Sequence, residues 1–159
     1  MTRHSTAFFV LLGAAVLAAD PSGLQPRPRR SEYAVTSFTA SLAVGATLLS
    51  SDEATHLFGA EAVRAFVIVE VGFYSKSHAP LALRHADFAL RRRGSGAVIR
   101  PVRAPRGTAL LEKALPEGVT TQALAGYLCF PAPSTTRDEW ELEYTGHGAW
   151  LVLPLEPRR

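Results

Sequence analysis

Short apolar segments of strand length, separated by glycine, proline and serine, follow one another from residue 33 to residue 155. Such segments alternate with turns far too often for a helical bundle, and their spacing is typical of antiparallel sandwiches and barrels. About seven or eight strands are expected. This pattern predicts an all-β fold.

The clearest predicted strand spans residues 64–74, because its side chains alternate regularly between two faces. One face carries Val67, Val69, Val71 and Phe73, and the other carries Phe66, Ile68 and Glu70. Both faces are apolar over half the length, so we expect a central strand covered on both sides. Glu70 should then reach solvent or a basic neighbour.

The other expected elements flank this strand. Residues 33–44 predict a first strand or a bent pair, and residues 51–58 a single short helix that starts at Ser51 and stops at Gly59. Residues 81–91 predict a strand with a bulge or kink at 85–87. Further strands are expected at 97–102, on a sheet edge after the glycine hairpin at 94–96, at 127–130, and at 139–145 paired with 149–155.

The first 31 residues predict export rather than a part of the fold. A short positive start at Arg3 and His4 precedes an apolar run at 7–17, and small residues before Ala19 fit a cleavage site, so residues 1–18 predict a signal peptide. A retained membrane anchor or an N-terminal core helix is the alternative. Residues 19–31 hold three prolines and three arginines, which predicts an extended, mobile linker before a domain at 32–156. The product should be periplasmic or secreted, with no integral membrane span after cleavage.

The composition excludes several function classes. Lys and Arg total 17 against 14 acids, and a net charge of +3 is too small to predict nucleic-acid binding. The single cysteine, Cys129, excludes an intramolecular disulfide and multi-cysteine metal sites, and we expect it to be a buried, inert thiol.

The segments 66–71, 87–91, 115–118 and 126–131 together resemble bacterial exported immunoglobulin-like domains of unknown function, similar to the secreted immunoprotective-antigen type of β-sandwich. The resemblance covers about residues 33–155. It implies an immunoglobulin-like antiparallel β-sandwich and a noncatalytic adhesion, interaction or envelope-associated role. The turn after the central strand often carries asparagine in that family, whereas Ser75, Lys76 and Ser77 stand here. No catalytic residues are implied.

A metal or hydrolytic site is the alternative function. His85 and Asp87 would lie on one face of a strand, and His78 could fold over from the preceding turn. Surface or locally hydrogen-bonded histidines are the preferred interpretation. No nucleophile-elbow or phosphate-binding glycine motif is present, so we predict no enzyme and no cofactor.

Charge is distributed unevenly in the second half of the chain. Seven arginines lie between residues 84 and 106 against one acid, while residues 138–143 carry four acids. The candidate ligand-binding arginines are Arg91, Arg92, Arg93, Arg100 and Arg103. They could form a basic edge that binds an anionic envelope polymer or an acidic exported protein. The alternative is that charge protects an exposed sheet edge from aggregation.

Trp150 is the remaining candidate binding residue. Leu151, Leu153 and Leu155 make a better core face than the residues between them, which would leave Trp150 exposed to stack on sugars or a partner protein. We favour its burial between sheets, because an exposed apolar face would promote association. The overall prediction is a noncatalytic extracytoplasmic binding or protein-interaction module of unknown ligand.

Overall fold

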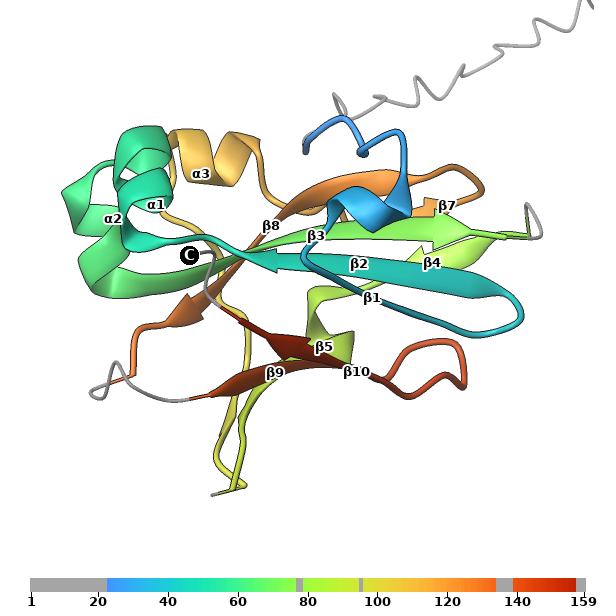
Figure 1. The fold of residues 1–159 in the computed structure, drawn as a ribbon. Coiled ribbons are helices and arrows are strands. Elements are labelled where there is room, and N and C mark those ends of the chain that lie inside the picture. Colours follow the sequence, from blue (N-terminus) through green and yellow to red (C-terminus); the bar gives the residue numbers. More distant parts are fainter. Residues whose placement is uncertain (1–22, 77–78, 95, 134–138, 157–159) are drawn as a thin grey trace, which may run out of the picture.

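The computed structural model describes residues 23–76, 79–94, 96–133 and 139–156, and the predicted signal peptide at 1–18 lies outside these ranges. The described residues form two four-stranded antiparallel sheets and one two-stranded sheet. In Figure 1 the first large sheet lies above the second. The prediction of a mainly β, antiparallel structure is confirmed, whereas the immunoglobulin-like sandwich stays a prediction.

The first sheet has the strand order β1-β2-β3-β8. Its strands are β1 (Val35–Phe38), β2 (Leu42–Leu48), β3 (Phe66–Ser75) and β8 (Leu124–Pro131). The predicted bent pair near residue 33 is therefore β1 and β2, and the predicted central strand is β3, which pairs with β2 on one side and β8 on the other.

The second sheet has the strand order β10-β9-β5-β6. Its strands are β5 (Phe88–Arg92), β6 (Val98–Ile99), β9 (Trp140–Tyr144) and β10 (Leu151–Leu155), and a separate pair joins β4 (Leu81–Leu83) to β7 (Gly118–Thr120). The strand that follows the glycine hairpin, β6, lies at an edge as predicted. The predicted single strand 81–91 is two strands, because the 3₁₀ turn η2 (His85–Asp87) separates β4 from β5, which lie in different sheets.

Three α-helices are present in the described ranges, so the prediction of one short helix is wrong in number. Helix α1 (Ser51–Phe58) occupies the predicted position and stops before Gly59, its C-cap, but its N-cap is Ser50, which forms a capping box with Glu53. Helix α2 (Ala60–Ala65) follows directly, and α3 (Ala109–Glu112) is a single turn. A second 3₁₀ turn, η1 (Arg30–Glu32), precedes β1. None of the helices in the described ranges has the length and apolarity that a membrane crossing needs.

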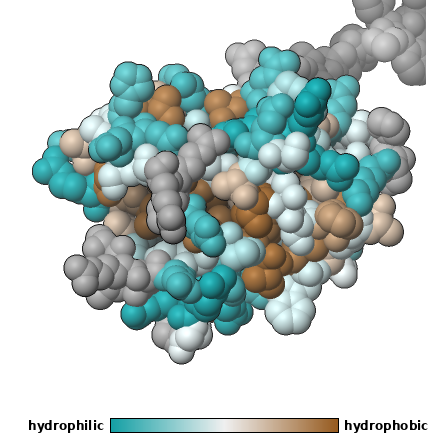
Figure 2. All heavy atoms as spheres, viewed as in Figure 1, coloured by the Kyte–Doolittle hydropathy of each residue, from teal (hydrophilic) through white to brown (hydrophobic). Residues whose placement is uncertain are grey.

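Both large sheets contribute to one hydrophobic core. Val69, Val71 and Phe73 of β3 are fully buried in it, together with Leu142 and Leu153 of the second sheet. The apolar side chains visible in Figure 2 gather on the side of the molecule where the edge strands β1 and β10 lie next to each other.

The outer face of the first sheet is also covered over part of its area. Ile68 and Cys129 point away from the main core and are buried in a second cluster with Ala54 of α1 and Leu110 of α3. The helices lie together over one end of the sheet in Figure 1. The prediction that β3 is covered on both faces is therefore confirmed.

Residues 23–33 lie across a further part of that outer face, which corrects the expected mobile linker for the described residues of that segment. The amide of Leu24 donates to the carbonyl of Ala125 at 2.8 Å, and the Arg27 side chain pairs with Glu70 of β3 through hydrogen bonds of 2.9 and 2.5 Å. The Tyr33 ring lies directly over Gly72, where a Cβ atom would overlap it. The folded part of the chain thus begins by residue 23, and Arg27 is the basic neighbour expected for Glu70.

Candidate functional site

Trp150 lies immediately before β10 and is 72% exposed, so the favoured burial of this side chain is wrong. The pairing of β10 with β9 explains the outcome. Leu151, Leu153 and Leu155 turn toward the core, and the alternation of the strand then places Trp150 and Val152 on the outer face. Among the large apolar side chains in the described ranges, Val119 alone is more exposed.

The indole of Trp150 is held by a nearly buried carboxylate. Its Nε1–H donates to Oε1 of Glu143 at 2.7 Å, and Glu143, on β9, is only 9% exposed. The other carboxylate oxygen of Glu143 accepts from Nη2 of Arg91 at 2.8 Å and from Nε at 3.2 Å. The Trp150 ring is therefore anchored at its edge by a charge-assisted hydrogen bond.

These side chains belong to one continuous surface. Arg91 lies opposite Glu141 on β9 and opposite Val98 on β6, while Glu143 lies opposite Val152 on β10. Directly opposed residues point to the same face of an antiparallel sheet. We call this surface the Trp150 face, and it consists of Arg91, Val98, Glu141, Glu143, Trp150 and Val152.

The predicted basic edge is neutralised by acids from β9 and the residue before it. Arg93 pairs with Glu139 at 2.8 Å and with Glu141 at 2.9 Å, in addition to the pair between Arg91 and Glu143. Arg91 and Arg93 therefore do have acidic neighbours, which the single acid between residues 84 and 106 does not indicate. The acids at 139, 141 and 143 recur every second residue, and this spacing was the signal in the sequence that they share one face of a strand.

The remaining candidate arginines do not join Arg91. Arg92 follows Arg91 in β5, so its side chain points to the opposite face of the sheet, and it lies opposite Trp140 in the strand register. Arg100 donates to the carbonyls of Ala86 and Phe88 at 3.2 and 3.3 Å. Arg103 lines a separate pocket of about 330 Å³ with His85 and Glu117. Of the six candidate residues, the structure brings Arg91 and Trp150 together, joins Arg93 to the same face through Glu141, and places Arg92, Arg100 and Arg103 elsewhere.

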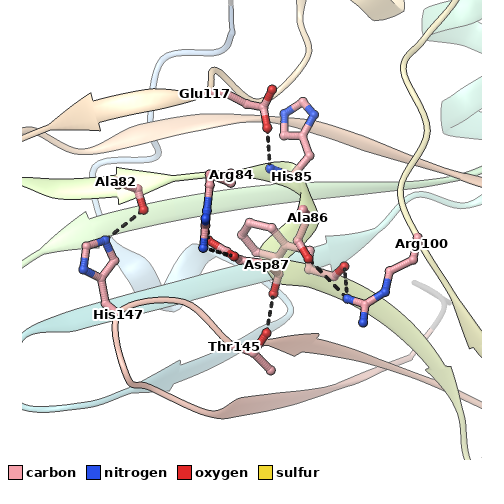
Figure 3. Close-up of polar contacts among 10 residues, drawn as sticks. Ala82, Arg84, His85, Ala86, Asp87, Arg100, Glu117, Thr145 and His147 are labelled. Carbon is pink, nitrogen blue, oxygen red and sulfur yellow. Dashed lines mark hydrogen bonds and ion pairs between the residues drawn. The ribbon is translucent and has the colours of Figure 1, made fainter.

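Of the three groups of the alternative metal or hydrolytic site, His85 and Asp87 lie in the described residues and bond to different partners there. His78 lies outside these residues. Both carboxylate oxygens of Asp87 accept from Arg84, at 2.8 and 3.2 Å, while Nε2 of His85 lies 2.5 Å from the carbonyl of Leu115. Figure 3 shows the His85 ring turned away from the Asp87 carboxylate. Within the described ranges, no group of three potential ligands lies close enough together to hold a metal ion.

Cys129 is buried in the cluster beneath the helices, as expected. Burial raises the pKa of its thiol to about 12. The thiol is therefore protonated at neutral pH and is a poor nucleophile.

Two solved structures have a similar fold. The yjhA protein from Bacillus subtilis matches 79% of this chain and 98% of its own chain at 13% identity, with a TM-score of 0.50. A protein provisionally assigned as a lipoprotein (ycdA), from Bacillus subtilis subsp. subtilis str. 168, matches 76% of this chain at 12% identity with a TM-score of 0.51.

The match with ycdA spans only 38% of that protein's chain. At these identities the likeness concerns the β-rich fold alone. No protein-family model and no curated protein matches the sequence.

Proposed function

We propose that this chain is a noncatalytic protein-interaction module outside the cytoplasm and that it binds its partner through the Trp150 face. The observation that carries the proposal is a tryptophan that is 72% exposed while its indole N–H is held by a nearly buried carboxylate. A large ring already fixed in one orientation loses little conformational entropy on binding. Tryptophan and arginine are also the residues that most often dominate the energy of protein interfaces.

The surroundings of Trp150 fit a protein partner better than a polyanion. Val98 and Val152 expose 43% and 40% of their surface, and they add apolar area beside the indole. The ion pairs of Arg91 and Arg93 with three glutamates leave no excess of positive charge among these five side chains. An apolar patch with a polar, charge-balanced surround is the usual composition of a protein interface.

The proposal includes export of the chain with cleavage of residues 1–18, and an immunoglobulin-like sandwich as its fold. The pattern of residues 1–18 supports a cleaved signal, and the provisional lipoprotein assignment of ycdA fits an exported protein. The shared core of the two sheets supports an immunoglobulin-like sandwich. Recovery of a chain that starts at Ala19 would support export with cleavage, and a membrane-bound chain that starts at Met1 would contradict it.

The experiment is photo-crosslinking of the mature chain to envelope proteins of its own source cell, with the reactive group at Val152. We expect a discrete crosslinked product that disappears in Trp150→Ala and weakens in Glu143→Ala, because the second variant removes the anchor of the ring. Val119→Ala is the matched control, since Val119 is 73% exposed but lies on β7, outside the Trp150 face.

A crosslinked product that forms equally well with Trp150→Ala would contradict the proposal. A second experiment measures the tryptophan fluorescence on addition of neutral polysaccharides, because exposed indoles also stack on sugars. Trp140 is only 7% exposed, so changes in emission on ligand binding should come from Trp150. A blue shift with a neutral polysaccharide and no crosslinked protein would assign the face to a sugar ligand instead.

A further inference from the structure

A second surface lies on the opposite large sheet, where residues 23–33 leave part of the outer face uncovered. A pocket of about 600 Å³ opens there. Its lining comprises Thr36 and Phe38 of β1, Ala43 of β2, Tyr74 of β3, residues 28–31 of the N-terminal segment, and Lys76. Strand register places Phe38, Ala43 and Tyr74 in one row, so they form its floor.

The rim of this pocket is cationic. Arg29, Arg30 and Lys76 contribute three positive charges, and no acidic residue is among the lining residues. Within the described residues, neither Arg29 nor Arg30 has an acidic side-chain partner, unlike Arg27, Arg91 and Arg93. Glu32, the acid nearest in sequence, contacts Arg27 through its main-chain carbonyl. The charge therefore fits an anionic ligand.

The pocket floor is aromatic and partly preorganised. Phe38 is 68% exposed, and the Lys76 ammonium lies 4.5 Å from its ring centroid. The same ammonium donates to the carbonyl of Thr39 at 2.6 Å, which fixes its position and leaves two further protons for a ligand. The Tyr74 hydroxyl donates to the carbonyl of Arg27 at 2.9 Å and so joins the floor to the N-terminal wall.

We propose that this pocket binds an acidic oligosaccharide, with its carboxylates on Arg29, Arg30 and Lys76 and a sugar ring against Phe38 and Tyr74. Guanidinium groups bind carboxylates through paired hydrogen bonds, and aromatic rings stack on the C–H face of sugars. Ser31 and Thr36 add hydroxyl groups at the wall and floor that can bond to sugar hydroxyls. This site is separate from the Trp150 face and does not depend on its function.

The test is calorimetric titration of the folded domain with tetragalacturonate and with its fully methyl-esterified form, which has the same length and no charge. We expect binding of the acid alone, with affinity that falls as salt is added. The double variant Arg29→Ser with Arg30→Ser should weaken binding at least tenfold, and Phe38→Ala should weaken it several-fold.

The matched control is Arg64→Ser with Arg106→Ser, which removes the same charge from two exposed positions outside the pocket lining. Retained affinity in this control supports the site, whereas an equal loss would show that only net charge matters and would overturn it. Equal binding of the methyl ester, or no binding of the acid, would also overturn the proposal. Binding to vesicles of anionic phospholipid without binding to tetragalacturonate would assign the cations to a membrane surface instead. Thermal melts of all variants establish that each is folded.

Discussion

Val69 shows how strongly a single core position constrains this chain. Its side chain is fully buried between Leu48 of β2 and Leu128 of β8 in the strand register, within the main core. An aspartate there would bury a carboxylate without a partner, at a cost of several kcal/mol. That cost is comparable to the whole stability of a domain of this size.

We therefore expect Val69→Asp to abolish cooperative unfolding in a thermal melt followed by circular dichroism. Val119→Asp makes the same chemical change at a side chain that is 73% exposed, and its effect should be about 0.5 kcal/mol or less. A cooperative melt of Val69→Asp at the temperature of the native protein would show that β3 does not face the core as described.

At the scale of the elements, the position of the N-terminal segment 23–33 depends on two glycines in the sheet beneath it. Tyr33 lies over Gly45 and Gly72, and a methyl group at either position would overlap its ring. The segment is otherwise held by Arg27 on Glu70 and by Leu24 on Ala125. Displacement of Tyr33 should therefore loosen the segment without opening the core.

We expect Gly72→Ala to lower the free energy of unfolding by about 1 to 3 kcal/mol, the usual range for overpacking. Trypsin should cut after Arg29 and Arg30 several times faster in this variant. The internal control is cleavage after Arg106, which lies outside the segment and should keep its rate. Uniform acceleration at all sites would mean global unfolding, and unchanged cleavage would mean that Tyr33 does not hold the segment.

The elements that sequence reasoning predicted well are those with several residues of regular alternation. Strands β3, β9 and β10 have this property, and the inward face of β10, with Leu151, Leu153 and Leu155, is the predicted one. Helix α3 was missed because four residues are too few to display a helical period, and α2 because no side chain caps its start. The segment 23–33 was missed because its contacts are made with residues far along the chain.

The Trp150 face was predictable only in part. Alternation along β10 predicts that Trp150 lies outside, whereas burial is favoured only by the tendency of an exposed apolar face to promote association. The hydrogen bonds that join Arg91 to Glu143 connect residues 52 positions apart. Such a pair depends on how β5 and β9 are aligned, and composition or spacing within one strand does not determine that alignment.

At the scale of the whole molecule, buried thiol and phenol groups should make the free energy of unfolding fall at alkaline pH. Burial raises the pKa of Cys129 from 9.0 to about 12 and that of Tyr144 from 10.0 to about 12, and it also raises the pKa of Tyr127. The folded protein retains these protons while the unfolded chain releases them. Their contribution is therefore complete below about pH 9 and is lost as the pH rises toward 12.

We expect the urea midpoint to be constant up to about pH 8 and to fall between about pH 9 and pH 11. Cys129→Ala removes the group with the lowest ordinary pKa, so the fall should start nearer to pH 10 in this variant. A midpoint that is the same at about pH 8 and pH 11 would contradict the burial of these groups.

The contact between the first described residues and β8 also sets the order in which this chain can fold. Leu24 bonds to Ala125, and β3 lacks its second partner until residues 124–131 are available. During synthesis, which starts at the N-terminus, the first sheet therefore cannot form completely until residues 124–131 have been made. Contacts between residues this far apart in the sequence make folding slow. A chain that folds late stays unfolded for longer, and an unfolded chain can pass through a channel that is too narrow for the folded domain.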